Sequence, residues 1–451
     1  MSAEPIGREE ARAVVEAALD LKGADDVEVL FVHEWGGLTR FADSAIHQST
    51  WREDTGLRIR VVTGNRVGVA STNEFTKDGA AKAARSALEL AGTSAPDPAF
   101  PGLAPPAEAP DRPGAYDQAT AEMSPAARAE AVAVLIAQAD EGFHAAGAFE
   151  TQAMEAAVVN TEGQFCYSAS TKATVTTVVS GGQGGAGFAD DAAAAAASID
   201  TEDVGRRAFA KARDSQNPRD LEPGTYPVVL EPAAVTTLAA FLSYLGFGGR
   251  SIAEGKSCFS GRLNERVVSE RISMYDDALS PDTMGLPFDF EGTPKQRVDL
   301  VKDGVVLGGV HDRRSAAQAG IASTGHALPP PNTEGAFPLN LFMAPGQASG
   351  DDLVAGLDRG LLVSRFHYSN IVHPKEAVIT GMTRDGTWWV EDGKIAHPVK
   401  NLRFTQSIVQ ALAGVEDVGR DTTLASEFFF EASRVPALRI SAFTFTGKSD
   451  H

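Results

Sequence analysis

Apolar and polar positions along the first ninety residues follow two different periods. Over residues 8–21 apolar side chains recur every three or four positions, which predicts an amphipathic helix. Residues 27–31 and 57–61 instead alternate between apolar and more polar positions, as half-buried strands do. A Gly-Asn turn then predicts a returning strand at 66–71, followed by a helix at 76–91. These elements form a predicted N-terminal α/β domain over residues 1–92.

The regular pattern breaks between residues 93 and 118. Seven prolines in this stretch leave no room for a hydrogen-bonded ladder, and they predict a linker or a long surface strap. Beyond it, Ser124-Pro125 opens a predicted helix that extends to residue 146, because a capping residue followed by proline is typical of a first helical turn. Two strands joined by a Thr-Glu-Gly hairpin turn are predicted at 151–160 and 164–179. Residues 119–220 are therefore interpreted as a middle α+β segment that continues the N-terminal half.

The second half, residues 221–451, is richer in predicted strands. A short buried strand at 226–230 is followed by an apolar helix at 232–247. Farther on, Asp385-Gly386 and Asp392-Gly393 separate three alternating stretches and predict an antiparallel meander, since Asp-Gly is a preferred hairpin turn. The expected fold class is α+β, with an N-terminal mixed α/β domain and a C-terminal, largely antiparallel β domain.

Charge and composition exclude several classes of partner. The chain has 40 Lys and Arg against 60 Asp and Glu, and its formal charge of −20 gives a surface that repels nucleic-acid phosphates. No stretch is apolar over the roughly 18 residues that a membrane span needs, and the start has neither the basic nor the apolar segment of a secretory signal. Two cysteines, Cys166 and Cys258, do not make a disulfide scaffold. We expect a cytoplasmic protein that binds neither nucleic acid nor membrane.

The nine histidines form no zinc-binding pattern. The only His-Glu dipeptide, His33-Glu34, lacks the second histidine of an HExxH helix and is expected to end a strand. His367 and His373 are six residues apart, a spacing that suits neither one helix face nor one strand face. His326 stands in a loop of small residues, where it could line a cleft. No metal site is predicted in this chain.

Nucleophiles and acidic pairs are equally incomplete. Cys258 lies two residues after Lys256, whose charge favours a thiolate, although a buried structural cysteine is the more ordinary interpretation. The chain has no GxSxG elbow and no phosphate-binding glycine loop. The adjacent acids 276–277 would point to opposite faces of a strand, and Asp289 and Glu291 flank a turn. The residues by themselves therefore indicate no complete catalytic constellation.

Several stretches, in order along the chain, resemble the TldD/PmbA family of peptidases. They extend from about residue 55 to residue 410, and their order and spacing are more specific than any one of them. The matching stretches are 55–61 (TGLRIRV), 68–71 (GVAS), 226–232 (YPVVLEP), 257–268 (SCFSGRLNERVV), 276–277 (DD), 287–292 (PFDFEG), 301–307 (VKDGVVL), 323–326 (STGH), 380–386 (TGMTRDG) and 390–395 (VEDGKI).

The resemblance implies a zinc metalloprotease complex in which this chain is the partner subunit. In the catalytic branch of the family, the helix after the VVLEP-like strand carries HExxxH, and a cysteine far downstream completes the zinc site. Here the corresponding helix, 232–247, has neither histidine nor cysteine, and no cysteine follows Cys258. This departure resembles the PmbA/TldE branch, so no metal is expected in this chain and zinc is expected in a TldD-like catalytic homologue. The family then implies a heterodimer that encloses a chamber in which an extended, unfolded peptide is cleaved.

Four residues are expected to contact substrate or partner: Arg250, Asp289, Glu291 and Arg384. Strand edges near residues 372–383 are expected to bind the peptide through backbone hydrogen bonds.

Two other functions stay open. One is an autonomous hydrolase of the same family, acting as a homodimer in specialised peptide or amide metabolism, with Cys258, His326 or His367 as candidate catalytic residues. The other is a non-enzymatic binding scaffold. A neighbouring gene for a homologue with HExxxH favours the complex, whereas about one zinc per protomer, lost in His367→Ala, favours the autonomous hydrolase.

Overall fold

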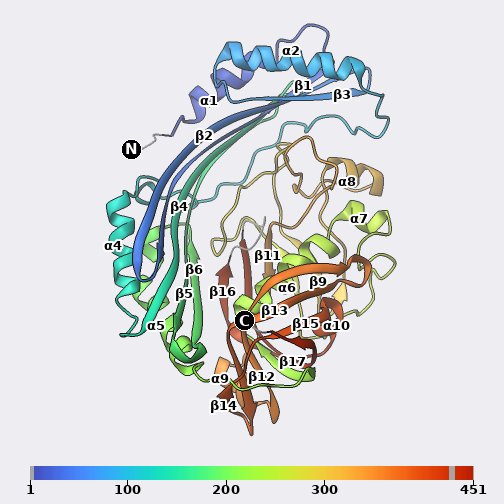
Figure 1. Cartoon of the computed structure of the whole chain (residues 1–451). Coiled ribbons are helices and arrows are strands. Elements are labelled where there is room, and N and C mark those ends of the chain that lie inside the picture. The colour runs from blue at the N-terminus through green and yellow to red at the C-terminus, as the bar shows by residue number, and fades with distance from the viewer. Residues whose placement is uncertain (1–4, 426–431, 450–451) are drawn as a thin grey trace.

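A computed structural model describes residues 5–425 and 432–449 of the chain. It contains a long, curved N-terminal sheet with helices on its outer face, and a C-terminal half that lies on the inner side of the curve (Figure 1). Both helices and strands occur in each half, so the expected α+β class is confirmed. None of the helices within the described ranges is long and apolar enough to cross a membrane.

The N-terminal sheet has six antiparallel strands in the order β3-β2-β1-β4-β5-β6. The strands are β1 (Asp26–Ala42), β2 (Ala45–Thr63), β3 (Arg66–Thr72), β4 (Phe143–Asn160), β5 (Phe165–Gly181) and β6 (Ala186–Ala193). The covering helices are α1 (Arg8–Val15), α2 (Lys77–Thr93), α3 (Gln118–Ala121), α4 (Pro125–Ile136) and α5 (Thr201–Asp214). Helices α1 and α2 cover one end of the sheet and α4 and α5 the other (Figure 1), and a separate apolar core lies beneath each pair.

Glycine and alanine determine how closely α2 approaches the sheet. The buried face of α2 consists of Gly79 and five alanines, and it packs against β2 and β3. Gly68 on β3 lies beneath this helix, and a Cβ atom there would overlap the main-chain oxygen of Ala87 and the main-chain nitrogen of Ala91. The GVAS stretch therefore has a structural role, since it lets a helix backbone contact a strand backbone.

Several predicted boundaries in this half are wrong. Strand β2 begins at Ala45 rather than at residue 57, and β4 begins at Phe143 rather than at residue 151. The helix that begins after Ser124 ends at Ile136 rather than at residue 146, because Gly142 turns the chain with a positive φ of 88° and Phe143 then begins β4. Strand β1 does not end at His33 but continues to Ala42. Gly37, within this longer strand, leaves the space that the buried Arg128 guanidinium fills.

The proline-rich stretch runs as irregular backbone between α2 and α3 and is held by the N-terminal sheet. Asp97 N donates to Asn65 O, and the Asn160 side chain donates to Ala104 O. Leu103 and Ala104 are buried. The stretch therefore packs against the rest of the chain along much of its length.

The C-terminal half is built on a mixed sheet that closes on itself. Strand β7 (Gly224–Leu230) pairs in parallel with β12 (Arg359–His373) and antiparallel with β17 (Ala432–Lys448), so β7, β12, β13, β15 and β17 form a ring. The other strands are β8 (Met274–Asp276), β9 (Val298–Lys302), β10 (Val305–Val306), β11 (Asn340–Met343), β13 (Val378–Glu391), β14 (Lys394–Pro398), β15 (Leu402–Ser407) and β16 (Val415–Ala425). The helices are α6 (Pro232–Gly246), α7 (Gly249–Ala253), α8 (Arg313–Ala319), α9 (Gly350–Ala355) and α10 (Ile408–Ala413).

Only one of the two predicted Asp-Gly turns is a turn. Asp392-Gly393 joins β13 to β14 as expected, with Glu391 paired to Lys394. At Asp385-Gly386 the strand instead continues, and the register with β12 shifts between Val363 and Arg365. Both residues have positive φ, 54° and 127°, so the pair forms a β-bulge within β13. Because β13 pairs antiparallel with β12 both before and after Asp385-Gly386, the strand does not turn there.

Candidate functional site

Helix α6 is the central element of the C-terminal half. Glu231 precedes it and Pro232 occupies its first turn, a position that proline favours because its missing N–H would have no partner there. Eleven of its fifteen residues are buried, and it packs against β12 and β17. The ammonium group of Lys211 on α5 lies 2.5 Å from the Glu231 carboxylate, which connects the start of α6 to the N-terminal half.

A cleft opens where α6 faces the N-terminal sheet. It encloses about 780 Å³ of empty space, its solvent-open mouth included. Side chains or backbone from both halves line it: Ala146, Gly147, Thr176, Thr177, Val178, Phe188 and Asp190 from the sheet, Ala233, Thr236 and Thr237 from α6, Arg365 and Phe366 from β12, and Ala425 from β16. Since β4 to β6 form one wall and α6 and β12 the other, the cleft exists only when the two halves are packed together.

The side chains that α6 offers to this cleft do not suit a metal ion. Ala233 has no donor atom, and the hydroxyl groups of Thr236 and Thr237 donate to the Pro232 and Ala233 carbonyls of their own helix. Within residues 5–425 and 432–449, no three His, Cys, Asp or Glu side chains are grouped closely enough to hold a metal. A zinc ion, which the family resemblance suggests for this helix, does not fit these residues, because zinc takes nitrogen, sulfur or carboxylate ligands.

The bulge in β13 places an ion pair beside the cleft. Arg365 Nε donates to Asp385 Oδ2 at 2.6 Å, and the guanidinium lies over the Phe188 ring with 4.2 Å between Cζ and the ring centroid. Because Phe188 belongs to β6, this contact joins the two walls of the cleft. A bulge commonly redirects a side chain in this way next to a functional site.

Asp190 is the acidic side chain among the described residues that line the cleft. It projects from β6 on the same face as Phe188, because alternate residues of a strand share a face. Burial raises the pKa of its carboxyl group to about 6. No hydrogen bond or ion pair among the described residues uses this carboxylate, so Asp190 is available to a ligand.

Two of the residues predicted from the sequence lie next to this cleft. Arg384 pairs in register with Arg365, and its guanidinium lies 3.9 Å from Asp385. His367, two residues after Arg365, is half-buried, and burial together with the charges of Arg365 and Arg384 lowers its pKa below the ordinary value. The structure therefore brings His367 and Arg384 to one end of the cleft, although neither lines it.

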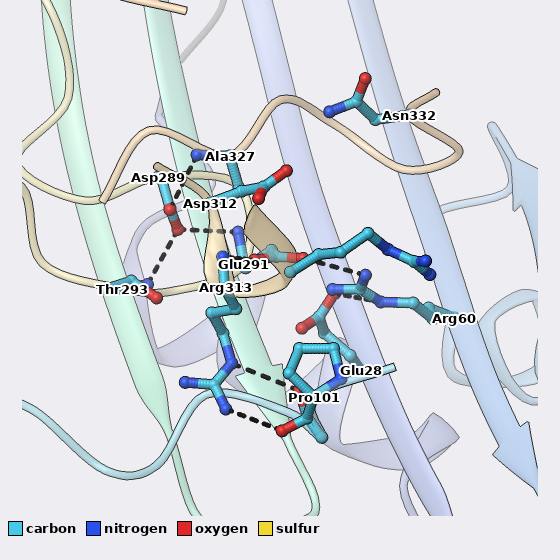
Figure 2. A network of polar contacts seen from close by, with 12 residues as sticks. Glu28, Arg60, Pro101, Asp289, Glu291, Thr293, Asp312, Arg313, Ala327 and Asn332 are labelled. Carbon is cyan, nitrogen blue, oxygen red and sulfur yellow. Dashed lines mark hydrogen bonds and ion pairs between the residues drawn. The ribbon is translucent and has the colours of Figure 1, made fainter. Parts of the chain in front are cut away.

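Arg250, Asp289 and Glu291, also predicted from the sequence, belong to a second site on the other side of the interface between the halves. Figure 2 shows its centre, where Arg60 from β2 lies between Glu28 from β1 and Glu291 from the C-terminal half. The guanidinium donates to Glu28 Oε1 at 2.6 Å and to Glu291 Oε1 at 3.1 Å. Arg250 lines the same hollow and donates to Thr333 O at 2.6 Å.

Further contacts of this network reach the proline-rich stretch. Arg313 donates to the carbonyls of Pro101 and Gly102 at 3.4 and 3.3 Å (Figure 2), and Arg314 forms an ion pair with Asp97. The network therefore joins the sheet, the proline-rich stretch and the C-terminal half.

Asp289 has a structural position within this network. Its carboxylate accepts hydrogen bonds from the main-chain N–H groups of Glu291, Thr293 and Ala327, at 2.9–3.0 Å (Figure 2). The side chain is buried, and burial and the neighbouring charge of Glu291 raise its pKa to about 7. Asp289 therefore holds its loop in place and is not accessible to a substrate.

Cys258 and His326 lie in the interior, apart from the cleft. Cys258 belongs to the large apolar core, and burial raises the pKa of its thiol to about 12, which disfavours a thiolate at neutral pH. His326 is fully buried, with Nε2 2.8 Å from Asp276 Oδ1 and Nδ1 2.9 Å from Thr324 Oγ1. These contacts connect a loop to β8, and they leave neither nitrogen for a substrate.

Two residues of the cleft, Asp190 and Arg365, were missed from the sequence. Asp190 stood in an Asp-Asp pair next to an alanine run, and Arg365 in a strand of ordinary alternation. The Asp-Gly bulge that orients Arg365 carries the same residues as a hairpin turn. No local sequence signal distinguishes an Asp-Gly bulge from an Asp-Gly hairpin turn.

Comparisons with known proteins agree with this architecture. The model of the PmbA/TldA metallopeptidase C-terminal domain matches residues 223–447, and the model of PmbA/TldA metallopeptidase domain 1 matches residues 27–91. Among solved structures, TldE from Thermococcus kodakarensis superposes with a TM-score of 0.87 at 21% identity, covering 97% of this chain and 99% of that one. At that identity the likeness shows the fold.

Curated relatives match over different lengths. Metalloprotease PmbA of Escherichia coli O157:H7 is 24% identical over 447 residues, which is 95% of each chain. A metalloprotease of Methanothermobacter thermautotrophicus is 26% identical over 235 residues, and a TldD homologue of Haemophilus influenzae is 27% identical over 209 residues. The chain spans 50% and 42% of the length of these last two relatives. The two family models together match more than half of the chain, which therefore belongs to the PmbA/TldD metallopeptidase family.

Proposed function

We propose that this chain is the TldE-type subunit of a two-subunit metallopeptidase and holds an extended, unfolded peptide while a TldD-like homologue supplies the zinc. The observation that carries the proposal is the surface of α6 in the cleft. That surface consists of Ala233, Thr236 and Thr237, which offer no metal ligand. A chain that keeps the family fold around a helix without ligands is suited to binding, since water activation by zinc needs at least three protein ligands.

Strand β12 supports the binding of an extended peptide. It pairs with β7 only over Leu361 to Val363, and no strand in the described part of the chain pairs with the same edge beyond that point. Arg365 and Phe366, at the start of this unpaired edge, line the cleft. A peptide that entered the cleft could add to β12 through backbone hydrogen bonds, which require an extended main chain and little sequence preference.

The test is reconstitution with and without a catalytic subunit. The purified chain is assayed for bound zinc and for cleavage of an unstructured peptide, first alone and then with a homologue that carries HExxxH. We expect substoichiometric zinc and no cleavage from the chain alone, and chelator-sensitive cleavage from the mixture. Chelator-sensitive cleavage by the chain alone would contradict the proposal. Unchanged peptide turnover by the complex with Arg384→Ala would contradict a contribution of this end of β12 and β13 to peptide binding.

A further inference from the structure

The cleft beside α6 contains one carboxylate that the protein leaves without a counter-ion. Among the described residues that line it, Asp190 and Arg365 carry a charge. Arg365 forms an ion pair with Asp385, because Arg365 Nε donates to the Asp385 carboxylate. The Arg365 guanidinium also lies over the Phe188 ring. From these described lining residues, the charge that has no ion-pair partner is therefore the negative charge of Asp190.

The other cations near Asp190 are also bound to different carboxylates. Arg207 on α5 donates from Nε to Asp203 at 2.7 Å, and its contact with Asp190 is a hydrogen bond to the main-chain oxygen. Lys211 on the same helix forms its ion pair with Glu231. Each basic neighbour forms its ion pair with another carboxylate, so these cations attract the Asp190 carboxylate from a distance and none of them forms an ion pair with it.

We propose that Asp190 binds a cationic group of the peptide, either a free N-terminal ammonium or the side chain of a lysine or arginine. This proposal rests on the proposed function and names the class of substrate that the same cleft prefers. A peptide cation would supply the missing counter-charge, and a charge-assisted hydrogen bond in a partly desolvated cleft is stronger than one between neutral groups. The formal charge of −20 adds a long-range attraction for basic peptides.

Position along the cleft supports the same assignment. Asp190 lies on the wall formed by β6, whereas the unpaired edge of β12 and the start of α6 form the opposite wall. A peptide strand added to β12 would have alternate side chains directed toward the N-terminal sheet, since successive side chains of a strand point to opposite faces. One of these side chains, or the terminal ammonium, would then meet Asp190.

The experiment measures peptide binding to the full-length chain by fluorescence anisotropy at pH 7.5 and physiological salt. Four fluorescent peptides of one unstructured sequence are compared: an N-acetylated neutral peptide, the same peptide with one central lysine, the same with one central glutamate, and the neutral peptide with a free N-terminus. The glutamate peptide tests whether any added charge changes the affinity, and the peptide with a free N-terminus tests a terminal ammonium in place of a basic side chain. We expect the lysine peptide, the free-N-terminus peptide or both to bind about tenfold more tightly than the neutral one.

Two isosteric variants decide whether Asp190 is responsible. Asp190→Asn should reduce the cationic preference to about twofold or less, while the neutral peptide binds as it does to the wild type. Asp191→Asn removes the same charge from the adjacent residue, which points to the other face of β6, and should keep the preference. Circular dichroism of both variants checks that they fold.

The possible results distinguish this inference from the proposed function. Equal binding of neutral and cationic peptides, or a preference that survives Asp190→Asn, would overturn the role of Asp190 and leave peptide binding intact. If Asp191→Asn reduced the preference for cationic peptides as much as Asp190→Asn does, the preference would reflect net charge in general. That result would also overturn the role of Asp190. Failure of every peptide to bind the wild type would overturn the peptide-binding role itself, and the inference with it.

Discussion

Glu28 shows how a single buried carboxyl group makes the junction between the halves sensitive to pH. It lies on β1 with 1% of its surface exposed, and burial raises its pKa from 4.5 to about 7, despite the hydrogen bond that it accepts from Arg60. Between these two values the folded chain retains a proton that the unfolded chain releases. The contribution of Glu28 to stability is therefore fully present below about pH 4.5 and is lost as the pH rises through 7.

Glu28→Gln should remove this pH dependence, since glutamine keeps an acceptor for Arg60 and does not titrate. Between pH 5.5 and 8 the free energy of unfolding of the wild type should fall by about 1–2 kcal/mol relative to the variant. Urea unfolding of both proteins across that range measures the difference. Parallel profiles for the two proteins would show that Glu28 keeps an ordinary pKa in the folded state.

At the scale of elements, the packing of α2 on β3 depends on a residue without a side chain. The main-chain oxygen of Ala87 and the main-chain nitrogen of Ala91 occupy the space that a Cβ of Gly68 would need. These are backbone atoms of a helix, which cannot rotate away as a side chain can. The close contact also explains why the buried face of α2 consists of small residues.

Gly68→Ala should destabilise the chain by about 2 kcal/mol, because the added methyl group overpacks a backbone contact. Gly56→Ala on β2 is the matched control: nothing lies within 4 Å of a Cβ at that position. The control should change stability by less than about 1 kcal/mol. Thermal or urea unfolding compares the two variants, and equal losses would show that α2 can move away from β3 without cost.

At the scale of the whole molecule, charged and aromatic contacts connect the two halves, and two of them involve buried or half-buried arginines. Arg365 over Phe188 joins them at the cleft, and Arg60 between Glu28 and Glu291 joins them at the site in Figure 2. Only 12% of the Arg60 side chain is exposed, so its charge is not screened as a surface charge would be. Both contacts therefore join residues of the N-terminal sheet to residues of the C-terminal half.

Arg60→Met should therefore cost about 3 kcal/mol at pH 8, since it leaves two buried carboxylates without their common partner. Arg52→Met on the same strand is the control. The Arg52 side chain is 72% exposed, so its ion pair with Glu34 should contribute at most about 1 kcal/mol. Urea unfolding at pH 8 measures both. If the two variants lost equal stability, the Arg60 network would be no more important than a surface ion pair.

Elements of the fold could be predicted where neighbouring residues alone determine them, and not where pairing with distant strands does. Both strands predicted from alternation over 27–31 and 57–61 are present, but only 57–61 alternates between buried and more exposed residues, whereas 27–31 is buried on both faces. Asp385-Gly386 was misread, because the same two residues suit a turn or a bulge, and long-range pairing with β12 selects the bulge. His33 does not end its strand, because β1 keeps pairing with β2 and β4 beyond it, and that pairing is long-range.

The sequence alone determined the fold class, the family and the absence of metal ligands from residues 232–246, because these depend on which residue types follow one another along the chain. Only the tertiary structure decided which residues share the cleft. Asp190 and Arg365 come from different halves, and Asp289, which looked accessible in its turn, is buried by contacts with a distant loop. The physical reason is that accessibility and neutralisation of a charge depend on packing between segments far apart in the chain, which local periodicity does not encode.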